Sequence, residues 1–157
     1  MVITDIVTAY LTATYSIITG DSVLQNIMNG VRLRYDWAQK DETFPYLIHR
    51  FSLGSLEPWA LRNGTYFINI WDYADTADRI LQIRDRLIFL LDERLFSIDD
   101  NGEPTQLTAA ERVIDAVRFY LDTDQPVDEL EQNIWRHHLT FSVRFGRSKE
   151  VRDILSR

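Results

Sequence analysis

Residues 64–94, GTYFINIWDYADTADRILQIRDRLIFLLDER, hold the two patterns that decide the fold. In the first part, apolar residues occupy every second position and most positions between them, which predicts a central strand over 65–71 that is covered on at least one side. In the second part, apolar residues recur at helical spacing, and they are Ile80, Ile83, Leu87, Leu90 and Leu91. This stripe predicts a long amphipathic helix whose first residues are capped by Asp75 or Thr76.

The segments on either side predict two further helices and more strands. Apolar spacing over 3–18 predicts an N-terminal helix, and a capping residue at 21–22 begins a short helix that the Asn29-Gly30 turn pair ends. Extended segments are expected at 45–52, 111–121 and 139–145, with short strands at 31–35 and 95–98 and a hairpin turn at 99–102. Segregated helices and strands favour an α+β fold. We therefore predict one domain over 1–157, with helices packed on one face of a mostly antiparallel four-stranded sheet.

Composition excludes several classes of protein. The 157 residues are 45% apolar and 12% aromatic, which is too rich in core-forming side chains for a disordered chain. There is no cysteine, so disulfides, thiol nucleophiles and cysteine-ligated metals are excluded. The net charge of −7 argues against a general polyanion binder, although a local basic face is compatible with it. No cationic segment precedes the apolar N-terminus and no apolar run approaches the ~20 residues of a membrane span, so neither export nor membrane insertion is expected.

No pattern of residues predicts catalysis. Motifs for serine hydrolases, phosphate-binding loops and dinucleotide binding are absent. His137 and His138 are adjacent near the last strand and should point to opposite faces, which is poor geometry for a shared metal. His49 is expected to be a hydrogen-bonded surface or edge residue. We therefore predict no catalytic, cofactor-binding or metal-binding residues, although carboxylates paired only in space would escape a sequence search.

An acidic segment follows the strand predicted at 111–121. Its five carboxylates are Asp122, Asp124, Asp128, Glu129 and Glu131. They could hold a divalent cation or repel nucleic acid, but the segment lacks the central glycine of a calcium loop. Solvated charge on a loop between two strands is the favoured interpretation.

The four tryptophans stand in or beside predicted loops and strand ends. They are Trp37, Trp59, Trp71 and Trp135. Tryptophan at such positions is typical of protein–protein interfaces, because it joins a large apolar area to a polar N–H group. Packing of these rings against the core is an equally good explanation from the sequence alone.

Residues 29–52, NGVRLRYDWAQKDETFPYLIHRFS, followed by 64–94, resemble the tail terminator proteins of tailed bacteriophages of the siphophage type. This family is also described as tail-completion or head-to-tail joining proteins. The matching positions are Phe44-Pro45-Tyr46, Ile70-Trp71, Ala77, Ile80, Ile83, Leu87 and the closing strand pattern between Trp135 and Phe145. The motifs are mainly structural, and their order and the total length carry the resemblance.

The resemblance implies a structural virion protein without enzymatic activity or cofactor. Such proteins are made in the cytoplasm of the host bacterium and form hexameric rings at the head-proximal end of the tail. The ring caps the tube of tail tube protein, ends its polymerisation and meets the head connector or completion protein, while DNA passes through as cargo and no membrane is involved. The alternatives are another neck or adaptor component, or a small intracellular enzyme or ligand-binding domain.

Within such a ring, the resemblance gives the singled-out residues expected positions. The acidic loop with Asp122, Asp124, Asp128 and Glu129 would line the lumen, where carboxylates do not bind phosphates. Trp59, Trp71 and Trp135 would lie at the subunit or tail-tube interface.

Overall fold

The computed structural model describes residues 6–56, 61–99, 101–105, 114–127 and 131–147. Within these ranges the chain forms three helices and seven strands. The elements are α1 (Ile6–Thr19), α2 (Ser22–Met28), β1 (Leu33–Tyr35), β2 (Tyr46–Leu56), β3 (Leu61–Tyr73), α3 (Asp78–Leu91), β4 (Leu95–Ile98), β5 (Pro104–Thr105), β6 (Ile114–Val127) and β7 (Ile134–Arg147).

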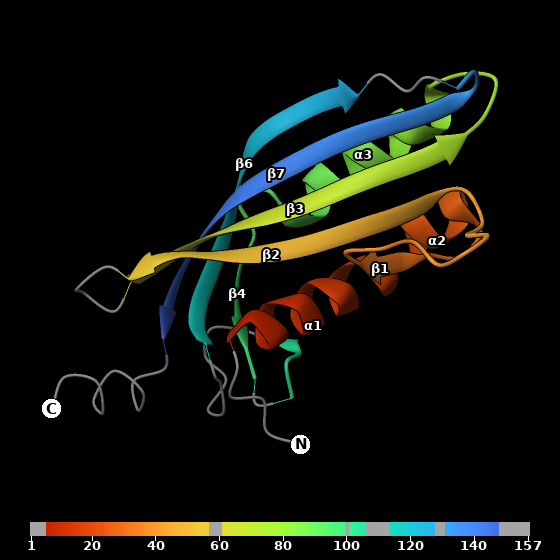
Figure 1. Cartoon of the computed structure of the whole chain (residues 1–157). Coiled ribbons are helices and arrows are strands. Elements are labelled where there is room, and N and C mark those ends of the chain that lie inside the picture. Colours follow the sequence, from red (N-terminus) through yellow and green to blue (C-terminus); the bar gives the residue numbers. More distant parts are fainter. Residues whose placement is uncertain (1–5, 57–60, 100, 106–113, 128–130, 148–157) are drawn as a thin grey trace, which may run out of the picture.

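The seven strands form one curled sheet in the order β1-β2-β3-β7-β6-β4-β5 (Figure 1). β1 runs parallel to β2, and the other neighbouring pairs are antiparallel. The α+β class and the mostly antiparallel sheet are thus confirmed, but the predicted number of four strands is wrong. β1, β4 and β5 add to the four long strands, and each has only two to four residues. β1 and β4 lie at the short strands expected at 31–35 and 95–98, which the predicted count of four left out. β5, with two residues, is too short to show any alternation in the sequence.

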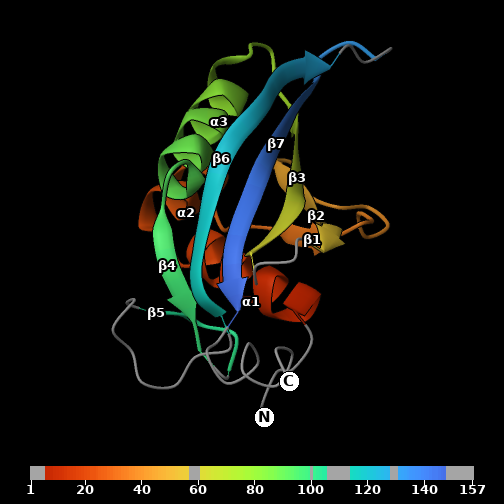
Figure 2. The same cartoon turned by 90° about the vertical axis from the view of Figure 1, so that its left-hand side faces the viewer.

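The three described helices lie on one side of the curled sheet (Figure 2). The side of α3 that faces the sheet carries the buried residues Ile80, Ile83, Leu87 and Leu91, as the apolar stripe predicts. Leu90 from the same stripe is only partly buried and packs against the edge of the core. The polar side of α3 faces away from the sheet, so the helix has the orientation expected of an amphipathic cover.

The ends of the helices agree only in part with the predicted caps. Asp21 caps α2 by accepting a hydrogen bond from the Leu24 backbone N–H at 3.0 Å, and Asn29 ends the helix in the left-handed conformation with φ 52°. At α3 the cap position is Ala77, without a side-chain hydrogen bond, so the predicted cap at Asp75 or Thr76 is wrong. Asp78 in the first turn still favours the helix start, because its charge complements the helix dipole.

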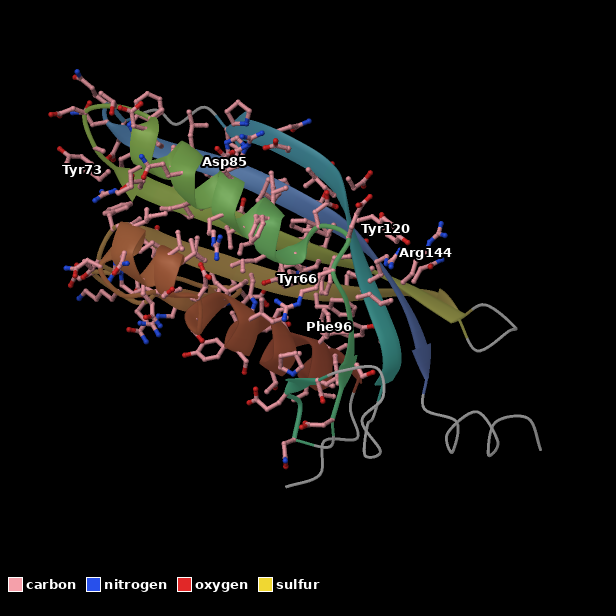
Figure 3. All side chains as sticks on the ribbon, turned by 180° about the vertical axis from the view of Figure 1, so that it is seen from behind. Tyr66, Tyr73, Asp85, Phe96, Tyr120 and Arg144 are labelled. Atoms are coloured by element: carbon pink, nitrogen blue, oxygen red, sulfur yellow. The ribbon has the colours of Figure 1, made fainter. Side chains whose placement is uncertain are left out.

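Aromatic rings fill the centre of the core between the helices and the sheet. Tyr66 is fully buried there and is labelled in Figure 3. Its ring lies 5.7 Å from that of Phe119, at an interplanar angle of 85°. Tyr10 from α1 stacks on Phe51 from β2 with ring centroids 4.5 Å apart. These contacts join α1 to β2, β3 and β6, so the N-terminal helix is part of the core that supports the sheet.

Gly64 in β3 is required by the close approach of Phe51. A Cβ atom at position 64 would lie 2.5 Å from Phe51 Cζ and 3.1 Å from the Ser52 carbonyl oxygen. The Phe51 ring is buried and stacked on Tyr10, so it has little freedom to move aside. We expect Gly64→Ala to lower the free energy of unfolding by about 2 kcal/mol, as overpacking does, in urea titrations.

The neighbouring variant Thr65→Ala is the control for Gly64→Ala. Its side chain points to the opposite face of β3 and is half-buried, and the substitution removes atoms instead of adding them, so its unfolding midpoint should stay much closer to that of the wild type. Equal stability of the two variants would contradict the packing of Phe51 over Gly64.

Candidate functional site

The two faces of the sheet differ in what covers them. Alternate residues of β2, β3, β6 and β7 point toward the helices and are mostly buried. We call the other side the open face, because the described helices all lie on the first side (Figure 2). Its residues include Ile48, Arg50, Phe67, Asn69, Trp71, Arg118, Tyr120, Arg136, His138 and Arg144.

Trp71 lies on the open face within a stack of side chains. The Arg136 guanidinium is placed over its ring at 4.7 Å from the centroid, which is the geometry of a cation–π contact. Tyr46 from β2 lies beside it, with ring centroids 6.0 Å apart and planes 12° apart. Trp71 is thereby half-buried, and the open face carries an aromatic surface covered by a positive charge.

Trp135 lies on the other side of the sheet. Trp71 pairs with Arg136 and Asp72 pairs with Trp135 in the β3–β7 register, so the two tryptophans point to opposite faces. The indole N–H of Trp135 donates to the Ala74 carbonyl at 2.9 Å, and the ring packs against the core. Trp59 lies outside the described residues. Trp71 and Trp135 therefore do not share one patch.

The acidic segment is in part a strand, so its prediction as a loop is wrong. Asp122 and Asp124 belong to β6, where a register shift between Leu121 and Thr123 places Asp122 at a bulge. Asp122 is exposed, whereas Asp124 faces the helix side and pairs with Leu139 in the register. Asp128 and Glu129 lie outside the described residues. Pairing with β7 gives the segment backbone hydrogen bonds that outweigh the low strand propensity of aspartate.

Asp124 is held by Arg84 from α3 and His137 from β7. Arg84 Nε donates to both carboxylate oxygens at 2.8 and 2.9 Å, and His137 Nε2 donates to Oδ1. The hydrogen bonds from Arg84, opposed by burial and assisted by His137, lower the pKa of Asp124 to about 2. Asp85 also accepts from Arg84, so the guanidinium bridges two carboxylates.

A hollow of about 410 Å³ lies next to this cluster, between α3 and the ends of β6 and β7. Leu81, Trp135 and Arg136 contribute to its walls. Among its described lining residues the one carboxylate is that of Asp124, which stays ionised at neutral pH and is a weak base, because its pKa is about 2. Among the described residues no group of three histidine or acidic side chains could hold a metal ion. The cluster therefore has the properties of a structural ion pair that joins α3 to the sheet.

The Asp124 cluster predicts a loss of stability in acid. The pKa of Asp124 is about 2 in the folded protein and near 3.8 in the unfolded chain, so its contribution is complete above pH 4 and disappears as the pH falls toward 2. We expect Asp124→Asn to lower the free energy of unfolding by about 2 kcal/mol at pH 7. Urea titrations should show that difference narrowing between pH 4 and pH 2.

Asp122→Asn is the matched control for Asp124→Asn. It removes the same charge two residues away, at an exposed position, and should change stability by less than about 0.5 kcal/mol. If both variants were equally destabilised, net charge and not the contact with Arg84 would explain the effect.

The three histidines occupy different environments. His49 is buried, with 4% of its surface exposed, and its Nδ1 lies 2.8 Å from the Tyr66 hydroxyl, so the prediction of a surface residue is wrong while the hydrogen bond is confirmed. His137 and His138 point to opposite faces of β7, as predicted. His138 Nδ1 donates to Asn69 Oδ1 at 2.8 Å on the open face. Burial, and then the charges of Arg136 and His137, lower the pKa of His138.

The residues that sequence reasoning missed are the arginines of the open face. They are Arg50, Arg118, Arg136 and Arg144. No basic run marks them in the sequence, because they come from three strands and alternate with residues that face the core. The alternation of residues along β7 was the signal that could have found this face, since it places Arg144 on the face of the strand that Phe141 and Val143 do not occupy. In the described part of the chain no helix has the length and apolarity to cross a membrane.

Solved structures with a similar fold exist. A chain of the virion of a native gene transfer agent particle matches with a TM-score of 0.64 and 15% sequence identity, covering 90% of this chain and 98% of its own. A second solved structure matches with a TM-score of 0.57 and 11% identity, covering 92% of this chain and 99% of its own. No protein-family model and no curated protein sequence matches the chain. The likeness shows that this chain and a virion component share a fold over nearly their whole lengths.

Proposed function

We propose that the chain is a structural virion protein of the tail-terminator type. Six copies would form a ring at the head-proximal end of a tail, end the polymerisation of the tail tube protein and meet the head connector or completion protein. The observation that carries this proposal is the fold shared with a gene transfer agent virion chain over 90% of this chain and 98% of that one. The order of the motifs in 29–52 and 64–94 supports the same family.

The distribution of exposed aromatic side chains supports assembly into a ring. Trp37, in the loop between β1 and β2, is 82% exposed, and Phe89 on α3 is 72% exposed. This loop and α3 lie on opposite sides of the molecule (Figure 2). A closed ring needs two different contact surfaces on each copy, because every subunit meets one neighbour on each side. Exposed rings at two separated positions fit that requirement.

A structural role also agrees with the chemistry of the polar groups. The ion pairs of Asp124 with Arg84 and of Asp72 with Arg79 join α3 to the sheet. Each of these carboxylates accepts hydrogen bonds from its arginine partner. We infer that these pairs position α3 and do not form an active site.

Purified tail tubes provide the test of this function. Tubes assembled without a terminator are mixed with the chain, and the length and ends of the tubes are followed by negative-stain electron microscopy. We expect a density with sixfold symmetry at one end of each tube, and no elongation when more tube protein is added. Continued elongation of all tubes would contradict the proposal. Binding to connector rings alone, without tube ends, would assign the chain to another component of the neck.

A further inference from the structure

The charge of this acidic protein is divided unevenly between its parts. The positions of β2, β3 and β7 that belong to the open face carry three arginines and no acidic residue. The arginines are Arg50, Arg136 and Arg144. The sequences of these three strands contain one acidic residue, Asp72. Asp72 faces the helix side, is fully buried and is paired with Arg79 of α3. The middle of the sheet is therefore basic on its open face, although the whole chain has a net charge of −7.

Two of the arginines on the open face oppose each other directly. Arg118 in β6 pairs with Arg144 in β7 in the register of the sheet. Like charges at such positions destabilise a sheet. Within the part of the chain that the structure describes, neither guanidinium forms an ion pair with a carboxylate, and Arg118 Nε is buried without a hydrogen-bond partner. An anion placed between the two side chains would offset this repulsion.

Figure 3 shows Arg144 next to Tyr120, away from the three helices. The guanidinium carbon of Arg144 lies 6.0 Å from the centre of the Tyr120 ring. Arg144 is exposed, so its N–H groups are accessible to a ligand that approaches the open face. A guanidinium is suited to phosphate, because it presents several N–H donors in one plane.

The basic surface is long. Arg136 and Arg144 stand on the same face of β7, eight residues apart, which corresponds to about 27 Å along a strand. Arg50 in β2 adds a third position, where its side chain is 66% exposed and lies 3.7 Å from Asp36. A small anion could contact only one end of such a surface. A polymer of phosphates would contact all of it.

Two aromatic rings in the middle of the open face already lie against other side chains. Trp71 is in contact with Arg136 and Tyr46, and Phe67 lies 6.3 Å from the ring of His138. Single-stranded nucleic acids are bound largely by stacking of unpaired bases on free aromatic rings. Covered rings and accessible guanidinium groups instead favour contact with the phosphates of a duplex, where the bases are paired and hidden.

We infer that the open face binds the phosphate backbone of double-stranded DNA, without preference for sequence. The residues that contact it are Arg118, Arg144, Arg136 and Arg50. These four arginines belong to one sheet of a single copy of the chain, so binding does not depend on the proposed ring. In a ring, it would direct this arginine face to passing DNA, in place of the acidic segment that sequence reasoning predicts for the lumen.

A fluorescence-anisotropy titration with a labelled 20-base-pair duplex tests this inference on the isolated chain. Neutralisation of three phosphates should weaken binding about 40-fold between 50 and 200 mM NaCl. Arg144→Glu should weaken binding at 50 mM NaCl by about tenfold or more, and should reduce the salt slope by about one. A second duplex of unrelated sequence should bind with the same affinity.

Arg94→Glu is the matched control, because it makes the same change of charge at an exposed position between α3 and β4. It should retain most of the affinity for the duplex. Arg136→Glu serves as a further test only if its thermal midpoint stays near that of the wild type, since Arg136 packs on Trp71. Arg144 is exposed, so Arg144→Glu should fold normally and tests the inference whether or not Arg136→Glu is stable.

Three results would overturn the inference. The first is the absence of duplex binding at 50 mM NaCl, and the second is equal weakening by Arg144→Glu and Arg94→Glu. The third is tighter binding of a single strand than of the duplex, which would show that bases are recognised. A chain that does not bind duplex could instead self-associate, and Arg144→Glu could abolish this self-association. That result would show that the open face binds an acidic surface of another copy. Failure to cap tail tubes would leave these measurements unaffected, so the two proposals can fail separately.

Discussion

The Leu87→Asp variant is expected to lose the native fold. Leu87 is 0% exposed and lies in the middle of the α3 stripe that covers the sheet. The substitution removes a buried leucine, which costs about 2–5 kcal/mol, and places a carboxylate in the hydrophobic core, which adds several more kcal/mol. Their sum is comparable with the total stability of about 5–15 kcal/mol of an ordinary domain. Circular dichroism and soluble yield should both report the loss.

Phe89→Asp is the control on the same helix. Phe89 is 72% exposed and contacts the Arg86 guanidinium at 4.6 Å from the ring centre. Loss of this contact costs about 1 kcal/mol or less, so the variant should be folded and soluble. If Leu87→Asp were as stable as Phe89→Asp, the packing of α3 against the sheet would be wrong.

A decrease in pH from 6.5 to 4 is expected to reduce the free energy of unfolding by about 3 kcal/mol through His49 alone. Burial lowers the pKa of His49 from 6.5 to about 4. The unfolded chain therefore takes up a proton in this range that the folded protein does not, and protonation favours the unfolded state. The Tyr66 hydroxyl contacts the ring at 2.8 Å, but the core around them offers little solvation for a charge.

Urea titrations at several pH values, on the wild type and on His49→Gln, measure this effect. Glutamine retains polar atoms near the Tyr66 hydroxyl but does not titrate, so the variant should be less stable at pH 7 and should lose much less stability between pH 6.5 and pH 4. Parallel pH dependences of the two proteins would show that other groups cause the loss. His138→Gln, at a position closer to solvent, should keep most of the wild-type dependence, because it leaves His49 in place.

Local patterns predicted the elements of this fold better than their arrangement. Helical spacing in 3–18 and 75–91 and the Asn29-Gly30 stop correspond to α1, α3 and the end of α2, because these signals act within one or two turns. The place of β7 between β3 and β6 could not be predicted from the sequence, since it depends on contacts between residues about 70 positions apart, such as Asn69 and His138. The cap of α3 was missed because tertiary packing of its apolar stripe fixes the helix start without a capping side chain.

The candidate site was harder to predict than the fold. The acidity of 122–131 suggested a loop, but Asp124 lies in a strand that pairs with β7. Its charge is paired with Arg84 on α3, and that partner stands 40 residues earlier in the chain. The basic open face escaped the sequence search for the same reason. Arg118 and Arg144 lie 26 positions apart in the chain and become neighbours only through the β6–β7 register. Patches of charge on a sheet arise when strand pairing brings distant residues together, whereas the composition gives only the net charge of the whole chain.

The position of β7 has a consequence for biosynthesis. A ribosome synthesises β3 long before residues 134–147, and β6 just before them, yet these two strands can be joined only through β7. Until β7 is made, the edge of β3 that does not pair with β2 has unsatisfied backbone groups and is able to pair with another chain. The sheet is thus completed after translation of the last strand, and the rate of that single insertion governs how long the exposed edges compete with aggregation.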